Sequence, residues 1–253
     1  MARRVPFWGD GRPRRGGLIE GDRWERIGNL AEAPESVSSL PFVRRFRGRA
    51  ASTTLDAVRA ANEATVAALA AALELRDDKT GSHARRVTAI ALSIARIVDS
   101  ELADDTEVRF GYLLHDIGKI GIPDRILLKP EALTRDEKRI METHTELGES
   151  LISSLPHLQG AAREVIVHHH ERWDGTGYPC GLAGEAIPLA ARIFAVADAF
   201  DALTSDRPYR RAVSESEALA EICHHSGTQF DPVVVEALVR VGHVGRVPLL
   251  AVS

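Results

Sequence analysis

The sequence predicts an all-α fold, and three observations support that prediction. Apolar residues recur at helical spacing through most of the chain after Thr53, no segment alternates strictly as a strand would, and helix start signals precede several periodic segments. The chain has 253 residues, of which 44% are hydrophobic and 27% charged. That composition can bury the core of one ordinary domain and still leave residues for an extension.

Residues 1–50 form the predicted N-terminal extension. They contain eleven Arg and six acidic residues, so this segment carries a net charge of +5 and the remainder carries −9. Gly, Pro and Ser interrupt any periodicity, so we expect irregular structure with at most a short helix near Asp22–Leu30. The extension is too short for a separate sensory domain, and its role stays open.

A connecting helix is predicted over Thr53–Leu75, within residues 51–76. Ala dominates this stretch, and neither Gly nor Pro interrupts it. Its apolar residues do not keep a heptad register. The helix could therefore be the stalk of a homodimer or simply the first helix of the domain.

The domain itself is expected over residues 77–245, as a helical bundle. Thr134 and Ser214 are the expected N-caps of two of its helices, because acidic residues follow each of them in the first turn. A loop rich in Gly and Pro spans residues 174–182. The predicted helices are His83–Val98, Asp105–Ile117, Arg135–Ser154, Ala161–His170, Leu189–Thr204, Ser214–His225 and Pro232–Val241.

Bulk properties argue against several classes of partner. A net charge of −4 provides no basic field for a nucleic acid polymer. Cys180 and Cys223 cannot make a disulfide framework and fit a reducing compartment. The amino terminus lacks the apolar core of a signal peptide, and no apolar run is long enough for a bilayer. We therefore expect a cytoplasmic protein without a membrane partner.

Five of the ten histidines lie in polar settings near predicted helix ends, namely His83, His115, His144, His169 and His170. Two adjacent pairs, His115-Asp116 and His169-His170, are informative because neighbouring helical residues point about 100° apart. Such pairs suit two neighbouring ions. Two metals ~3.5–4 Å apart and bridged by a carboxylate serve phosphate-ester hydrolysis. Imidazole with carboxylate favours Fe, Mn, Zn or Ni over Mg or Ca.

A second carboxylate comes from the segment around Asp198. Asp198 and Asp201 share one helix face, and Asp198, flanked by Ala on both sides, is the better ligand candidate. Asp201 could equally serve as a cap or in a salt bridge. His168 is expected to face outward, and His157, His224, His225 and His243 are expected to be surface or packing residues.

Several motifs in order resemble the HD-GYP domain, a branch of the HD phosphohydrolases that hydrolyses cyclic di-GMP. The resemblance runs from about Asp77 to about Val241. It rests on His115-Asp116-Ile-Gly-Lys119, on His169-His170-Glu171 followed by Gly177-Tyr178-Pro179, and on Asp198-Ala-Phe-Asp201 followed by Arg207 and Arg210. It implies an HD-type helical bundle with a binuclear metal site.

The resemblance also implies a role for each matching position. Asp116 would bridge two cations, with His144, His169 and His170 on one side, His115 and Asp198 on the other, and His83 adjoining them. Water held between the cations would attack phosphorus as hydroxide. Lys119 would contact the scissile phosphate, and Arg207 and Arg210 the substrate phosphates. Gly177, Tyr178 and Pro179 would shape the pocket or dock diguanylate cyclase domains.

The chain departs from some family members at Lys79. Those members have a Glu at this position that helps to hold a third metal, whereas a cation disfavours an extra ion. We therefore expect two metals, most simply Fe or Mn, with Zn or Ni as alternatives.

The function implied is that of a metal-dependent phosphodiesterase in bacterial second-messenger signalling. It would cut cyclic di-GMP to pGpG, with further cleavage to GMP left open. Two alternatives stand beside it. The domain could bind cyclic di-GMP or dock partners without turnover, or it could hydrolyse another nucleotide, including a mixed cyclic dinucleotide such as cyclic GMP-AMP.

Overall fold

The structure is a computed structural model, and it describes residues 41–77, 83–206 and 211–243. Its internal contacts divide the chain into two units, Met1–Val58 and Arg59–Ser253. Helix α3 (Pro41–Asp77) begins in the first unit, and the elements that follow it belong to the second. The expectation of irregular structure is wrong for residues 41–50, because α3 begins at Pro41 and is longer than the helix predicted over Thr53–Leu75. The helix predicted near Asp22–Leu30 lies outside the described residues, and the predicted domain boundaries stay predictions.

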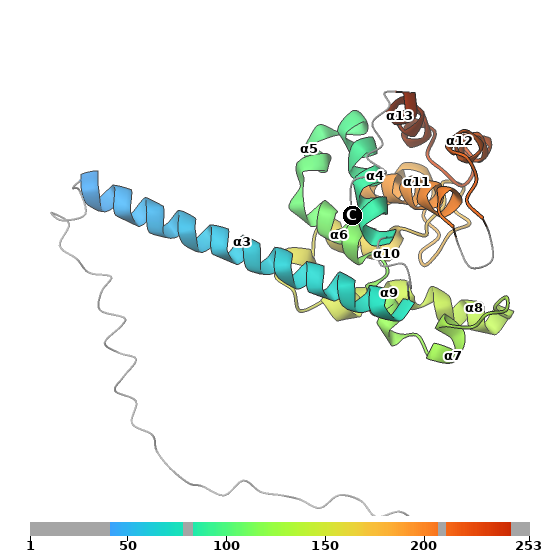
Figure 1. The fold of residues 1–253 in the computed structure, drawn as a ribbon, viewed down its shortest axis with the longest axis horizontal. Helices are drawn as coiled ribbons and strands as arrows, with labels where there is room; N and C mark the ends of the chain where they lie inside the picture. Colours follow the sequence, from blue (N-terminus) through green and yellow to red (C-terminus); the bar gives the residue numbers. More distant parts are fainter. Residues whose placement is uncertain (1–40, 78–82, 207–210, 244–253) are drawn as a thin grey trace, which may run out of the picture. The chain divides into compact units, whose positions relative to one another are not determined.

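The described part of the second unit consists of helices and loops, without a strand (Figure 1), which confirms the all-α prediction. Isolated bridges join Asp174 to Ala183 and Ser226 to Phe230. After α3 the elements are α4 (His83–Val98), α5 (Ser100–Asp104), α6 (Thr106–Leu114), η1 (Ile117–Gly121), α7 (Asp124–Leu127), α8 (Arg135–Glu142), α9 (His144–Ile152), η2 (Pro156–Leu158), α10 (Ala161–His168), η3 (Gly184–Ala186), α11 (Leu189–Thr204), α12 (Glu215–His224) and α13 (Pro232–His243).

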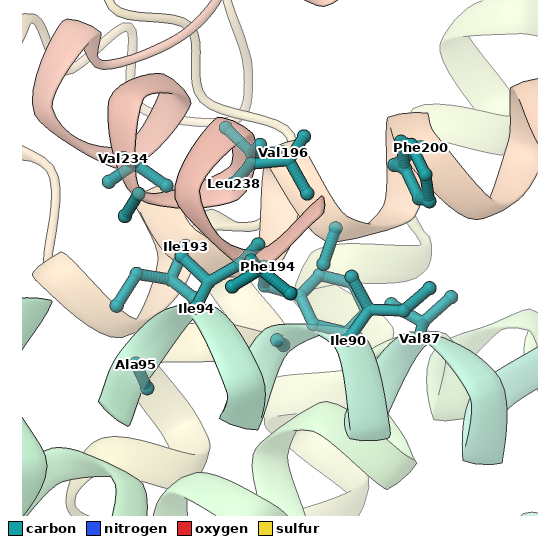
Figure 2. Packing of buried hydrophobic residues seen from close by; sticks show 14 of the residues in the cluster. Val87, Ile90, Ile94, Ala95, Ile193, Phe194, Val196, Phe200, Val234 and Leu238 are labelled. Atoms are coloured by element: carbon teal, nitrogen blue, oxygen red, sulfur yellow. The ribbon is translucent and has the colours of Figure 1, made fainter. Parts of the chain in front are cut away.

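The larger hydrophobic core holds α4 against α11 and α13. Ile90 and Ile94 follow one face of α4 and pack towards Phe194 of α11, with Leu238 of α13 covering the same cluster (Figure 2). All four side chains are almost completely buried. Because this core fixes α4 beside α11, it sets His83 at the start of α4 close to Asp198 on α11.

A second core holds α6, α9 and α10 together beneath α3. Val66 of α3, Leu114 of α6, Ile152 of α9 and Ile166 of α10 belong to one buried cluster. The carboxyl-terminal ends of α6 and α10 therefore lie close together, and these are the ends that His115 and His169 follow.

The helix predicted over Arg135–Ser154 is broken in the structure, which corrects that prediction. Helix α8 ends at Glu142 and α9 starts at His144, with Thr143 between them. The amide and hydroxyl of Thr143 both donate to the Ile140 carbonyl, at 3.2 and 2.7 Å, so the hydrogen-bond pattern of an α-helix stops there. The break places His144 at the first position of a helix.

Other helix boundaries agree with the sequence more closely. Helices α4 and α11 have the predicted bounds, whereas α6 and α10 end at Leu114 and His168, before the residues predicted to ligate metal. The caps Thr134 and Ser214 are confirmed, and each makes a reciprocal capping box with the Glu three residues later.

The structure also describes the two cysteines and the apolar character of the helices. Cys180 and Cys223 are both exposed free thiols. Of the helices in the described ranges, none combines the length and the apolar character that a bilayer crossing requires.

Candidate metal centre

Asp116 lies at the centre of the candidate site, between the end of α6 and the start of η1. Its two carboxylate oxygens face different groups. Oδ1 lies 3.4 Å from Nε2 of His144 and 3.8 Å from Nε2 of His169. Oδ2 lies 3.1 Å from Nε2 of His115 and 2.8 Å from Nζ of Lys119. The two oxygens of this carboxylate therefore face two different groups of histidine nitrogens, His144 and His169 on one side and His115 on the other.

Backbone carbonyls orient three of these imidazole rings. Nδ1 of His115 lies 2.9 Å from the Tyr112 carbonyl oxygen, and Nδ1 of His144 lies 2.8 Å from that of Met141. Nδ1 of His169 lies 3.0 Å from the carbonyl oxygen of Ile166. A carbonyl only accepts, so each Nδ1 carries a proton, and in the neutral form of the ring the lone pair is then on Nε2, which faces Asp116. Metal-ligating histidines are oriented in this way.

Four donors are close enough to share one cation. Oxygen or nitrogen atoms of Asp116, His144, His169 and His170 all lie within 4.8 Å of one another. Burial lowers the pKa of His144 to about 4 and lowers that of His170 well below its usual range. Both rings are therefore neutral at pH 7, which is the form that binds a metal.

A second group adjoins this cluster on the other side of His115. Nε2 of His83 lies 3.3 Å from Oδ1 of Asp198, and its Nδ1 lies 2.7 Å from Oδ2 of Asp201. The rings of His83 and His115 meet edge to face, with centroids 5.8 Å apart. Burial alone would lower the pKa of His83, but the hydrogen bonds to Asp198 and Asp201 raise it to about 10.

Asp201 is the feature that fixes His83 in place. The sequence left Asp201 open between a metal ligand and a cap or salt bridge, and the structure shows a buried salt bridge. Its Oδ1 lies 2.7 Å from Nε of Arg86, while its Oδ2 contacts His83. A carboxylate behind an imidazole sets the direction of the other ring nitrogen, so Asp201 positions Nε2 of His83.

An Asp201→Asn variant should therefore bind metal more weakly at the position that His83 faces. Outer partners of this kind typically contribute ~10–100-fold to metal affinity, and we expect a loss of that size. Competition with a chromophoric chelator would measure it. Asp104→Asn, at an exposed position, is the matched control and should bind as the parent does. Unchanged affinity in Asp201→Asn would show that the contact has no positioning role.

The loop around Tyr178 forms one wall of a pocket beside the cluster. The Tyr178 ring stacks on His170, with centroids 4.7 Å apart. Gly177 lies against the backbone of the same loop, because a Cβ there would come within 2.4 Å of the Arg172 amide nitrogen. The pocket has a volume of about 330 Å³, and its lining includes Lys138, His170, Tyr178, Asp198 and Gln229. This volume lies at the lower end of the range for small-molecule sites.

The structure brings most of the sequence-predicted site residues together. His83, His115, Asp116, His144, His169, His170 and Asp198 form one continuous cluster, and Lys119 contacts its central carboxylate. Tyr178, Gly177 and the following Pro179 belong to the adjoining loop. Arg207, Arg210 and Lys79 lie outside the described residues.

Sequence reasoning missed several residues around the site. Arg86 lies one helical turn after His83, but nothing in its spacing indicated the contact with Asp201. Lys138, Arg172 and Gln229 line the pocket from segments far apart in the sequence. The expectation that His168 faces outward is wrong: only 16% of its side chain is exposed, because it packs beside the buried Glu171.

The donor set fits divalent transition metals. Imidazole nitrogens and carboxylate oxygens are the ligands that Fe, Mn, Zn and Ni accept, and buried carboxylates require a compensating positive charge. The oriented Nε2 atoms supply the necessary lone pairs. The residues present could therefore hold metal on both sides of Asp116.

Comparisons with known proteins show which family the chain resembles. A family model described as "HD domain" matches residues 67–234. Two similar curated proteins are named cyclic di-GMP phosphodiesterase. The one from Vibrio cholerae is 40% identical over 202 residues, covering 74% of this chain and 41% of that protein. The one from Thermotoga maritima is 47% identical over 170 residues, covering 66% and 46%.

Another relative has a different name. A Vibrio cholerae protein named 3'3'-cGAMP-specific phosphodiesterase 2 is 38% identical over 171 residues, covering 67% of this chain and 33% of that protein. This chain thus spans about half the length, or less, of the curated relatives that it matches.

A solved structure shares the fold. The cyclic GMP-AMP specific phosphodiesterase V-cGAP3 of Vibrio cholerae superimposes with a TM-score of 0.56 at 24% identity, covering 72% of this chain and 49% of that one. At that identity the similarity supports the helical fold and nothing further.

Proposed function

The chain belongs to the HD domain family, and on that premise we propose that it is a metal-dependent phosphodiesterase that hydrolyses cyclic di-GMP to linear pGpG. The observation that carries the proposal is the carboxylate of Asp116, whose two oxygens face separate histidine groups. A bridging carboxylate of this kind is what a two-metal hydrolytic site needs. The names of the relatives support cyclic di-GMP as the substrate.

The ligands divide between two sides of Asp116 in this proposal. His144, His169 and His170 would hold one metal with Oδ1, and His115 and Asp198 the other with Oδ2, with His83 adjoining. We propose two metals rather than three, because this chain has Lys79 where some members of the family it resembles have the Glu that helps to hold a third metal. Fe or Mn is the first choice, and Zn or Ni the second. When bound, these cations supply Lewis acidity and lower the pKa of water.

The chain's own residues would position the phosphodiester. Nζ of Lys119 lies 2.8 Å from Oδ2 of Asp116, so a phosphate oxygen next to that carboxylate would be within reach of the ammonium group. Tyr178 presents a flat ring beside His170 on which a base could stack, and Gly177 and Pro179 shape the same wall. Arg207 and Arg210 are proposed as further phosphate contacts because guanidinium groups bind phosphate bidentately.

A Lys119→Ala variant should keep its metal and lose turnover. Lys119 contacts the carboxylate but is not a ligand, so its removal takes away a positive charge beside the phosphate and no metal ligand. We expect kcat/KM to fall by about 10²–10³-fold, the usual cost of one electrostatic stabiliser. Metal analysis beside steady-state kinetics would separate the two effects. Lys129→Ala is the control, since Nζ of Lys129 pairs with Glu137 instead and should not influence turnover. Loss of metal in Lys119→Ala would contradict this role.

The choice between cyclic dinucleotides can be tested directly. Relatives named for cyclic di-GMP and for 3'3'-cGAMP are both similar to this chain, so the mixed cyclic dinucleotide is the second candidate substrate. Protein loaded with Mn(II) or Fe(II) without oxygen would be given each compound, and the linear products separated by chromatography. We expect a higher kcat/KM for cyclic di-GMP, whereas a higher value for the mixed compound would reassign the substrate.

Further proposals cover the domain organisation of the chain, its location in the cell and its partners. We propose that residues 77–245 form the catalytic domain, that residues 51–76 connect it to the extension 1–50, and that the protein works in the cytoplasm, on a bacterial second messenger. The Gly177–Pro179 loop is proposed as a contact for diguanylate cyclase domains, and α3 as the contact of a homodimer. A domain that binds cyclic di-GMP without cleaving it is the alternative, and the substrate assay distinguishes it.

A further inference from the structure

A second group of potential ligands lies behind the pocket loop, outside the Asp116 centre. It is built around Glu171, whose side chain has no exposed surface. Each of its oxygens accepts one backbone hydrogen bond, from the amide of Cys180 at 2.8 Å and from that of Leu182 at 3.1 Å. Within the described residues no Lys or Arg forms an ion pair with this carboxylate, and the imidazole of His168 lies 3.7 Å from it. A buried carboxylate in that situation favours a cation.

His168 has an unused nitrogen at the same place. Its Nδ1 is buried, has no hydrogen-bond partner in the part of the chain that the structure describes, and lies 3.7 Å from Oε1 of Glu171, which is too long for a hydrogen bond. A buried polar atom left without a partner is destabilising. Together the unpartnered nitrogen and the buried carboxylate point to a ligand between them.

Cys180 supplies the third donor. Its amide is fixed to Glu171, and its thiol is exposed. A nitrogen of His168, an oxygen of Glu171 and the sulfur of Cys180 all lie within 4.8 Å of one another. Donors that share a tetrahedral zinc ion are separated by roughly 3.3–3.8 Å, given metal–ligand bonds of ~2.0–2.3 Å. Rotation of the exposed Cys180 side chain could bring its sulfur from within 4.8 Å of the other two donors to the separation that zinc ligands have.

We propose that His168, Glu171 and Cys180 form a separate site for a thiophilic divalent metal, with Zn(II) as its ion. Thiolate ligands select Zn(II) over the harder cations, whereas the Asp116 centre has only nitrogen and oxygen donors. Three protein ligands leave a fourth position for water or an incoming group. The metal would tie the end of α10 to the loop that carries Tyr178, and so brace one wall of the pocket.

Cobalt(II) provides a probe that distinguishes this site from the Asp116 centre. Co(II) takes the same ligands as Zn(II), and a thiolate bound to it gives a charge-transfer absorption band in the near ultraviolet that nitrogen and oxygen ligands cannot produce. Metal-free protein would be titrated with Co(II) under reducing conditions. We expect the band to appear, to saturate at one equivalent per chain for this site, and to disappear when Zn(II) is added.

Variants assign the band to its residues. Cys180→Ser and His168→Ala should each abolish the band, and each should lower the number of Zn(II) ions bound per chain by one. Cys223→Ser, the other exposed cysteine, is the matched control and should keep the band at parental intensity. Asp116→Ala should also keep it, so failure of the proposed phosphodiesterase function leaves this test unaffected. No band in the parent protein, or an unchanged band in Cys180→Ser, would overturn the proposal.

Discussion

An Asp116→Ala variant should lose its metal and its phosphodiesterase activity together. Both carboxylate oxygens face histidine donors, so the substitution removes one ligand from each proposed metal position at once. It also leaves Lys119 without its carboxylate partner. We expect kcat/KM to fall by more than the ~10³-fold that removal of a single electrostatic stabiliser costs. Elemental analysis and product chromatography would measure the two losses in the same preparation.

The control for this result is a carboxylate that has no place in the site. Asp136 is an exposed residue of α8, and Asp136→Ala should retain both metal and activity. His144→Ala tests one side of the centre alone, and it too should strip metal and activity. Circular dichroism would establish that each variant remains folded. Full activity in Asp116→Ala would refute the proposed mechanism.

A Gly118→Ala variant should be destabilised and should also lose metal, although Gly118 binds nothing. A Cβ at this position would lie 1.8 Å from the His144 carbonyl oxygen and 2.4 Å from the Gly148 amide nitrogen. Both are backbone atoms of α9, so η1 and α9 would have to separate, and Asp116 would move away from His144. Overpacking of this kind costs typically 1–3 kcal/mol or more. A domain of this size would then melt about 2–12 °C lower, as thermal unfolding would show.

Gly121→Ala is the matched control for Gly118→Ala. Gly121 belongs to the same 3-10 helix, but its added Cβ would meet only the end of the Leu147 side chain, at 2.9 Å. A flexible side chain can move aside, so we expect a much smaller change in melting temperature and unchanged metal content. Equal effects at Gly118 and Gly121 would show that the contact between η1 and α9 does not set the geometry of the site.

Local sequence signals were sufficient for much of the fold. Periodicity gave the bounds of α4 and α11, and the acidic first turns after Thr134 and Ser214 identified two capped helices. The break at Thr143 could not be read in the same way, because the residues on both sides have ordinary helical propensity. It depends on hydrogen bonds from Thr143 to Ile140 and on the packing of α9 against η1.

For the candidate site, too, local sequence indicated some residues, whereas others depend on how the helices pack. Ligand types and the pairs His115-Asp116 and His169-His170 indicated a metal site, and residue chemistry made His83, His144 and Asp198 candidate ligands. The resemblance to the HD-GYP domain implied how these ligands divide between two ions. The sequence could not show that Asp201 stands behind His83 with Arg86, because that contact depends on how α4 packs against α11. Nor could it show that His168 turns towards Glu171.

We propose that this chain cleaves cyclic di-GMP with two metals bridged by Asp116. Titration of metal-free protein with Mn(II), which has little affinity for the thiolate of Cys180, tests it most directly. The rate of pGpG formation would be followed against the number of Mn(II) ions bound. We predict that activity rises until two ions are bound per chain and then stays constant. Binding of cyclic di-GMP without pGpG formation at any number of Mn(II) ions bound, or full activity at one ion per chain, would contradict the proposed two-metal cleavage.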